Sequence, residues 1–304
     1  MIDLSVVIPN RNSPYLTPTI KDVLKNAGCN VEVIVNVDEN WPEELVEDER
    51  VTYIHPPTPI GLRQGVNACV KLAKGKYIMK CDDHCAFGEN FGKILIEAHQ
   101  DNWVQIPRRY ALDPVKWGIE EREDDKYPVD YMYIDFPRKG KDHDDGMHGV
   151  PWKERRNEMN PTSAHIYGTR LPLSIDDTPS MQGSCWFMTK DYFNQLNLMD
   201  ETGYGQFSQE AQEIGFKAWL SGGAVKVNKK TWYAHLHKGK THGRFYKMPS
   251  GTVEASNWSA EHWLNDREPN MIHKFAWFIN EKFPNMPSWP ENWEEEIRRM
   301  GWIS

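Results

Sequence analysis

Short apolar segments alternate with amphipathic ones along the N-terminal part of the chain, and this alternation restricts the possible folds more than any other feature. We predict β-strands at 4–9 (LSVVIP), 31–40, 50–57 and 77–81 (YIMKC). Helices are predicted between them, at 14–28 and 61–76. Strands and helices in this order, joined by short links, are typical of a parallel sheet covered on both faces. We therefore expect an α/β fold.

The rest of the chain is less regular. A strand leading into a helix is predicted at 181–196, followed by a helix at 208–223, an extended segment at 224–238 and a helix at 271–283. Residues 108–180 are rich in charge, Pro, Gly and Tyr and are predicted to form an irregular insert. We expect two parts, a domain at 1–247 and a helical, Trp- and Pro-rich extension at 248–304.

The composition excludes several classes of protein. No run of about 18 apolar residues occurs, so we expect no membrane span. The N-terminus MIDLSVVIPN reads as a strand rather than a basic leader. Five cysteines without regular spacing suit a reducing compartment, and we expect a cytoplasmic protein. The net charge of −8 argues against binding nucleic acid over the whole surface.

Polar residues follow several of the predicted strands. They are Asn10 and Arg11, then 38–40 (DEN), then 82–84 (DDH). In open sheets of this kind, ligands bind at the carboxyl ends of the strands. No G-x-G-x-x-G or G-x-x-x-x-G-K follows the first strand, which argues against a dinucleotide site or a P-loop. A nucleotide held by side chains and a metal ion remains compatible with the pattern.

The triplet Asp82-Asp83-His84 has three readings. It could be a turn in which the aspartates bond to their own backbone. It could belong to a structural zinc site with Cys81 and Cys85, although no second cysteine pair with suitable spacing occurs. Thirdly, carboxylate and imidazole could hold Mn²⁺ or Mg²⁺ against a diphosphate, neutralising the charge of a departing phosphate.

These residues carry a resemblance to the nucleotide-sugar glycosyltransferases of the GT-A fold, family 2 type. The triplet is a D-x-H variant of their metal signature, and with Cys85 it resembles the DSHC of the polypeptide N-acetylgalactosaminyltransferases. Three later segments are similar to motifs of that family in the same order, namely TPSMQGSCWFMTKDYF (178–193), EAQEIGFKAWLSGG (210–223) and WYAHLHK (232–238). The lead-in 206–209 (QFSQ) and Ala211 depart from the family pattern.

The resemblance implies a metal site of Asp82, His84 and His235, with His237 as a rival because alternate residues of a strand share a face. It implies Mn²⁺, or Mg²⁺, as cofactor and a UDP-sugar as donor. Asp83, between the two ligands, is expected to point differently and to touch the sugar or ribose.

The predicted nucleotide pocket is formed by the ends of the first two strands and the second helix. Asp38 would accept a hydrogen bond from the base, or serve only in a turn. Pro9 and Arg11 would line the pocket. Arg63 would reach the ribose or diphosphate, or else lie exposed on its helix.

Two glutamates and a glycine are predicted on the sugar side. Glu210 and Glu213 are three apart and share a helical face, which on a surface helix would be solvated charge. If this face meets the pocket instead, one of the two could bind sugar hydroxyls or act as general base. The resemblance favours Glu210. Gly183 would let the sugar approach the backbone closely.

A basic and aromatic segment, 226–247, contains Lys238 and Arg244. It could cover the diphosphate and stabilise the leaving group, bind a polyanionic acceptor such as DNA, or form a solvated strand edge.

We therefore expect a metal-dependent glycosyltransferase that moves a sugar from a UDP-sugar to a hydroxyl acceptor. Similarity to the N-acetylgalactosaminyltransferases favours retention of the anomeric configuration, whereas the resemblance to family 2 relatives would imply inversion. The acceptor could be a protein, a glycan or a hydroxymethylated base in DNA, and the insert 108–180 could face it. The alternative is a non-catalytic protein of the same fold that binds carbohydrate or nucleic acid.

Overall fold

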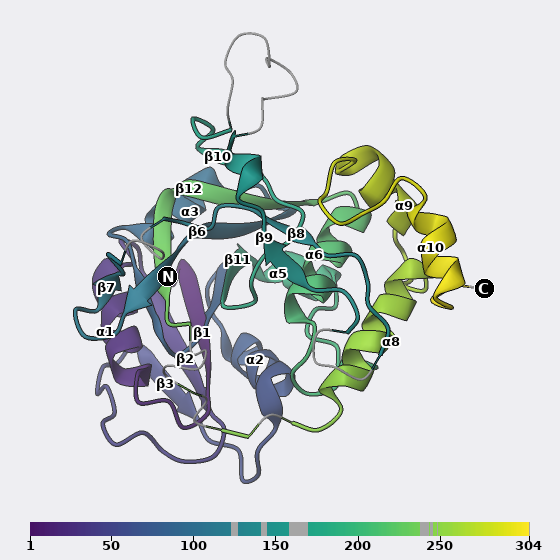
Figure 1. Cartoon of the computed structure of the whole chain (residues 1–304). Helices are drawn as coiled ribbons and strands as arrows, with labels where there is room; N and C mark the ends of the chain where they lie inside the picture. The colour runs from purple at the N-terminus through teal and green to yellow at the C-terminus, as the bar shows by residue number, and fades with distance from the viewer. Residues whose placement is uncertain are drawn as a thin grey trace.

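The computed structural model describes residues 1–122, 127–140, 145–157, 170–237, 243, 246–247 and 249–303. Within these ranges the chain forms a ten-stranded sheet with helices on both faces (Figure 1). The main strand order is β10-β12-β6-β11-β4-β1-β2-β3, with β5 paired to β12 and β7 paired to β6. The predicted α/β fold with a mostly parallel sheet is confirmed.

The first four strands form the parallel part of the sheet. They are β1 (Leu4–Asn10), β2 (Val31–Val37), β3 (Val51–Ile54) and β4 (Tyr77–Cys81). β1 lies between β2 and β4 and runs parallel to both, and β3 runs parallel to β2. The apolar residues of β1 and β2 are fully buried, as expected of strands covered on two faces. The carboxyl ends of these strands therefore meet at one edge.

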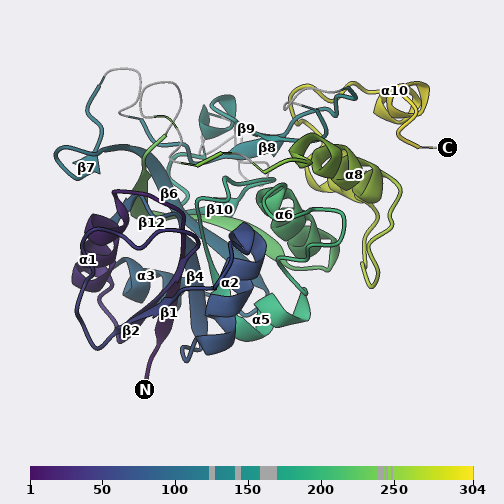
Figure 2. The same ribbon diagram turned by 90° about the horizontal axis from the view of Figure 1, so that it is seen from below.

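Helices flank this part of the sheet on opposite sides. α1 (Leu16–Asn26) and α3 (Phe91–Ala98) cover one face, and α2 (Gly61–Leu72) and α5 (Lys190–Gln195) cover the other (Figure 2). α3 is held beside α1 by a hydrogen bond from the Lys93 amide to the Ala27 carbonyl. The core thus has three layers, with the strand ends left open at one edge.

The second part of the sheet brings a distant strand to the same edge. β11 (Cys185–Thr189) is antiparallel to β4, and β12 (Ala224–His235) is parallel to β6 (Trp103–Asp113). The pairing of β12 with β6 shifts between Asn228 and Trp232, where β12 bulges. Beyond the bulge, β12 pairs with β5 (Cys85–Phe87), and His235 lies opposite Cys85. The end of β12 is thereby placed next to residues 82–84.

Helix α6 (Glu210–Leu220) is buried on every side. It packs against β12 on one side and against α8 (Thr252–Leu264) on the other. α8 was not predicted from the sequence. Hydrogen bonds from Gln209 to Ser256 and from Ser208 to the Thr252 carbonyl tie the start of α6 to α8. The predicted boundary at 247/248 stays a prediction, but these contacts cross it.

The remaining elements lie at the periphery. They are β7 (Gly118–Ile119), the paired β8 (Met132–Ile134) and β9 (Gly149–Pro151), η1 (Glu154–Asn157), β10 (Ile175–Asp177), α9 (Phe275–Trp277), the π-helix η2 (Phe278–Lys282) and α10 (Trp293–Arg299). The aromatic C-terminal helices lie at the opposite end of the molecule from α1 (Figures 1 and 2). No helix in the described ranges has the length and apolar character to cross a membrane.

Candidate active site

A cavity of about 470 Å³ opens where β1, β2, β4 and β12 end. Its wall is completed by the segment before β11 and by the first turn of α6. Nine of the predicted site residues line it, namely Pro9, Arg11, Asp38, Asp82, Asp83, His84, Gly183, Glu210 and His235. The carboxyl edge of a parallel sheet is where ligands of such folds bind, so the cavity is the candidate active site.

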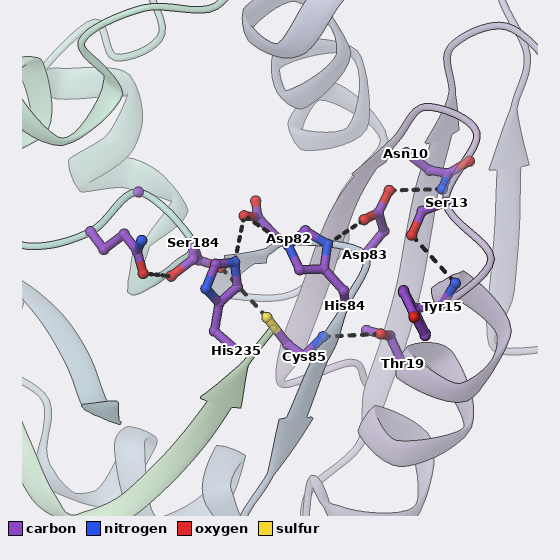
Figure 3. A network of polar contacts seen from close by, with 12 residues as sticks. Asn10, Ser13, Tyr15, Thr19, Asp82, Asp83, His84, Cys85, Ser184 and His235 are labelled. Carbon is purple, nitrogen blue, oxygen red and sulfur yellow. Dashed lines mark hydrogen bonds and ion pairs between the residues drawn. The ribbon is translucent and has the colours of Figure 1, made fainter. Parts of the chain in front are cut away.

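Three side chains in the middle of this cavity point toward one another (Figure 3). Asp82, His84 and His235 each offer a ligand atom, and these atoms lie within 4.8 Å of one another. Asp82 Oδ2 is 3.2 Å from Nε2 of His235 and 3.8 Å from Nε2 of His84. This is the one group of three or more potential metal ligands among the described residues.

Asp83 holds His84 in place instead of facing outward. Its Oδ1 lies 2.6 Å from His84 Nδ1, and its Oδ2 accepts a hydrogen bond of 2.8 Å from Asn10 Nδ2 (Figure 3). With Nδ1 as the donor, the lone pair of His84 is on Nε2, which faces Asp82. Both oxygens of Asp83 thus orient its neighbours, while the residue also lines the cavity. Its contact with sugar or ribose stays a prediction.

The three residues fit a divalent cation. One carboxylate oxygen and two imidazole nitrogens form a donor set that suits Mn²⁺ better than Mg²⁺. Burial lowers the pKa of His235 to about 3, so its imidazole is neutral and able to coordinate. The zinc alternative is not supported, because Cys81 and Cys85 do not belong to the cluster. Burial raises the pKa of both thiols well above their usual range, which keeps them protonated.

A buried lysine lies beneath the cluster. Lys80 Nζ donates to Asp82 Oδ1 at 2.7 Å and to the Gly183 carbonyl at 2.6 Å, and it lies 3.3 Å from Glu210 Oε2. Burial alone would lower the pKa of Lys80, but the carboxylates of Asp82 and Glu210 raise it above its usual value. Lys80 was not among the predicted site residues. The available signal was a charged residue inside the otherwise apolar strand YIMKC.

Glu210 is the acidic residue of α6 that reaches the cavity. Its Oε1 accepts a hydrogen bond of 2.8 Å from the Trp186 indole. Burial raises the pKa of Glu210, with the Lys80 charge opposing the shift. Gly183 is what makes this approach possible, because a Cβ at that position would lie 2.7 Å from Glu210 Oε2. Gly183 thus gives room to a side chain of the protein itself.

Arg11 and Asp38 form the other end of the cavity. Asp38 accepts hydrogen bonds from the amides of Ile60 (2.6 Å) and Gly61 (3.0 Å), at the start of α2, and from the Arg11 guanidinium. Arg11 also lies over the ring of Tyr246, 5.8 Å from its centroid. Asp38 therefore fixes the start of α2 and the position of Arg11. Its contact with a base stays a prediction.

Two predicted site residues do not line the cavity. Arg63 and Glu213 are both 0 % exposed and form an ion pair behind the wall. Arg63 also donates to the carbonyls of Asp200 and Ser208, and Glu213 also pairs with Lys217 at 2.9 Å. The expected roles of Arg63 at the diphosphate and of Glu213 in catalysis are corrected to a structural one, because these groups anchor α6 to α2.

The basic segment after β12 is only partly covered by the structure. Lys238 and Arg244 lie outside the described residues, so their predicted roles stay predictions. His237, the rival of His235, lines the cavity but is exposed and does not belong to the three-residue cluster.

With this geometry in place, comparisons with known proteins define the family. The model of glycosyl transferase family 2 matches residues 5–196, more than half of the chain. This chain belongs to glycosyl transferase family 2. The predicted class, a glycosyltransferase, is confirmed, and so is the similarity to the polypeptide N-acetylgalactosaminyltransferases that the sequence motifs indicated.

Several relatives support this family assignment. Polypeptide N-acetylgalactosaminyltransferase 12 of Mus musculus is 22% identical over 89% of the chain and 45% of its own length. The glycosyltransferase GlyG of Streptococcus pneumoniae is 29% identical over 34% of the chain and 37% of its own length. The chain spans less than half the length of these curated relatives.

A solved structure of GalNAc-T7 with UDP, GalNAc and Mn²⁺ has a similar fold. The match has a TM-score of 0.70 at 18% identity and covers 95% of this chain and 59% of that one. Because it extends over nearly the whole chain, it includes most of the C-terminal helices as well as the sheet. The family-model region, by contrast, ends at residue 196, before Glu210 and His235.

Proposed function

We propose that this family 2 member is a Mn²⁺-dependent glycosyltransferase that moves a sugar from a UDP-sugar to a hydroxyl acceptor with retention of configuration. The observation that carries the proposal is the cluster of Asp82, His84 and His235 inside a cavity at the strand ends. A protein of the same fold, GalNAc-T7, was solved with UDP, GalNAc and Mn²⁺, which supports this choice of donor and ion.

The cavity has distinct ends that suit the two parts of such a donor. The end formed by Arg11 and the start of α2 would take the nucleoside, and the end formed by Gly183 and Glu210 would take the sugar. Asp82, His84 and His235 lie between them and would hold the ion. A bound divalent ion would supply neutralisation of the charge that develops on the departing diphosphate.

The side chains of the protein perform the positioning. Asp83 and Asn10 orient His84, so that its Nε2 faces the ion position. Glu210, held by Trp186, presents a carboxylate to the sugar end, where it would accept hydrogen bonds from sugar hydroxyls.

Retention of configuration follows from the motifs of the site. The site motifs resemble those of the polypeptide N-acetylgalactosaminyltransferases, which favours retention. The acceptor would be a hydroxyl of a protein, a glycan or a hydroxymethylated base in DNA.

UDP release tests the proposal directly. The purified chain, given MnCl₂ and UDP-GalNAc or UDP-glucose, should release UDP, and EDTA should abolish the release. Asp82→Ala should be inactive. Asp48→Ala, which removes a surface carboxylate paired with Arg50, should behave as the wild type. Release that survives in Asp82→Ala would contradict the proposal.

A panel of acceptors tests which hydroxyl receives the sugar. Hydroxymethylated DNA, unmodified DNA, a serine- and threonine-containing peptide and an oligosaccharide are compared for stimulation of UDP release. The anomeric configuration of the product, read by proton NMR coupling constants, decides between retention and inversion.

A further inference from the structure

We propose that Lys80 is a positioning residue of this active site, a built-in cation that decides which oxygen of Asp82 faces the metal ion and that ties the ion site to Glu210. The inference rests on the proposed function and extends it to a residue of the cavity floor. Its ammonium group lies against two carboxylates of the protein, so Lys80 would act through them.

The Lys80 ammonium group has an oxygen partner for each of its hydrogens. The side chain is 1 % exposed, and Nζ has three oxygen partners, Asp82 Oδ1 at 2.7 Å, the Gly183 carbonyl at 2.6 Å and Glu210 Oε2 at 3.3 Å. An ammonium group has three donor hydrogens. All three are thus accounted for by groups that belong to the metal cluster and to the sugar end of the cavity.

The two oxygens of the Asp82 carboxylate have different partners. Oδ1 points down to Lys80, while Oδ2 points to the imidazoles of His235 and His84. With Oδ1 occupied, Asp82 can offer the ion a single oxygen. The ion would then have three protein ligands, and its other coordination positions would remain open for diphosphate oxygens and water.

Lys80 also joins two carboxylates that would otherwise repel each other in a buried site. Asp82 and Glu210 come from β4 and α6, and Lys80 Nζ lies within hydrogen-bonding distance of both. The same ammonium is a fixed positive charge close to the ion position, and like charges a few ångström apart weaken each other's binding. Lys80 therefore lowers the affinity of the site for Mn²⁺, and in return it fixes the positions of Asp82 and Glu210.

Removal of the Lys80 charge should change Mn²⁺ affinity and the rate of transfer in opposite directions. Without the Lys80 charge, the ion loses a repulsive neighbour, and Asp82 is free to bind it with both oxygens. Mn²⁺ should then bind more tightly. Transfer should nevertheless fall, because Glu210 loses an anchor and the ion loses open positions. A lysine that served stability alone would not separate binding from turnover in this way.

The chain offers a matched control in Lys217. It is also 1 % exposed, and its Nζ donates to Glu213 at 2.9 Å and to the Asn197 carbonyl at 2.8 Å. It thus pairs with a glutamate of the same helix as Glu210, but it does not line the cavity. Lys217→Met removes a comparable buried cation without touching the metal cluster.

The experiment compares Lys80→Met with Lys217→Met in the full chain. Mn²⁺ affinity is measured with MnCl₂ alone, by isothermal titration calorimetry and by the EPR signal of free Mn²⁺, and kcat and KM follow from UDP release. For Lys80→Met we expect Kd for Mn²⁺ to fall by about tenfold and kcat to fall by about a hundredfold. Lys217→Met should lose stability with an unchanged Kd.

Several outcomes would overturn the inference. They are an unchanged or weaker Mn²⁺ affinity in Lys80→Met, and equal effects of the two variants on Kd. If Lys80→Met does not fold, Lys80→Gln keeps a donor for the Gly183 carbonyl without the charge, and the same shifts are expected there. If the wild type itself shows no Mn²⁺ site that Asp82→Ala abolishes, the proposed function fails, and this inference fails with it.

Discussion

The two ends of the cavity are built in different ways. At the nucleotide end, Arg11, Asp38 and the start of α2 come from neighbouring strand–helix units, and their contacts join residues about two dozen positions apart. At the proposed sugar end, Lys80 and Glu210 join distant parts of the chain, and behind the cavity wall Arg63 and Glu213 do the same. The sugar end therefore depends on the fold as a whole, and its charges serve stability and chemistry together.

The largest expected effect distinguishes two histidines at the end of β12. His235→Ala should weaken Mn²⁺ binding by more than about 100-fold, the upper limit for residues that only support a ligand. His237→Ala should leave the affinity near that of the wild type, because His237 lies outside the cluster. Calorimetric titration with MnCl₂ measures both. The reverse pattern would move the third ligand to His237.

The next effect concerns stability behind the cavity wall. Glu213→Gln leaves the buried cations Arg63 and Lys217 without their carboxylate. We expect a loss of about 3–5 kcal/mol in the free energy of unfolding, measured by urea denaturation. The Kd for Mn²⁺ should stay unchanged in the folded protein. A variant of normal stability with impaired transfer would return Glu213 to the catalytic group.

A smaller effect is expected from the residue that orients His84. Asp83→Asn keeps the shape of the side chain but weakens its hold on His84 Nδ1. Mn²⁺ affinity should fall by about 10- to 100-fold, with little change in stability. Calorimetry and urea denaturation together check this. If affinity is unchanged while KM for the donor rises, Asp83 contacts the donor, as the sequence first suggested.

The smallest effect is a pH dependence of stability that comes from the partly buried His99. His99 packs on Phe187 of β11, and burial lowers its pKa to about 4. At a pH between this pKa of about 4 and the ordinary histidine pKa of about 6.5, His99 binds a proton in the unfolded chain but not in the native state. The free energy of unfolding therefore falls as the pH falls through this range.

His99→Gln should remove about 2 kcal/mol of that dependence, a value discounted for partial exposure. Urea denaturation at pH 7 and at pH 4.5 measures it. An equal pH dependence in the variant and the wild type would assign the acid sensitivity to other groups.

The sequence predicted the part of the molecule that depends on local patterns. The strand–helix alternation was sufficient for the parallel sheet, and the triplet Asp82-Asp83-His84 together with three later motifs indicated the family. The contacts that needed the tertiary structure were missed or misassigned. Glu210 and Glu213 share a helical face by spacing, but α6 is buried all round, so only packing decides that one reaches the cavity.

Dependence on tertiary contacts also explains the other differences between the predicted and the observed site. Asp83 was expected at the substrate, and its contacts with Asn10 and His84 were not predicted, because a motif does not show which neighbour each carboxylate contacts. Lys80 has a local partner in Asp82, but its contacts with Gly183 and Glu210 lie far along the chain, so its place in the site was overlooked. Helix α8 escaped prediction because its apolar residues do not form a clear stripe along the segment TVEASNWSAEHWL.

The bulge in β12 has a consequence for how this family member tolerates insertions and deletions. Between Asn228 and Trp232 the strand advances four residues while β6 advances one, and only after that step does the chain reach Cys85 with His235. Side chains of a strand alternate between its two sides. Deleting one residue at 229–231 would carry Leu236 to the place of the imidazole and leave an apolar side chain facing Asp82.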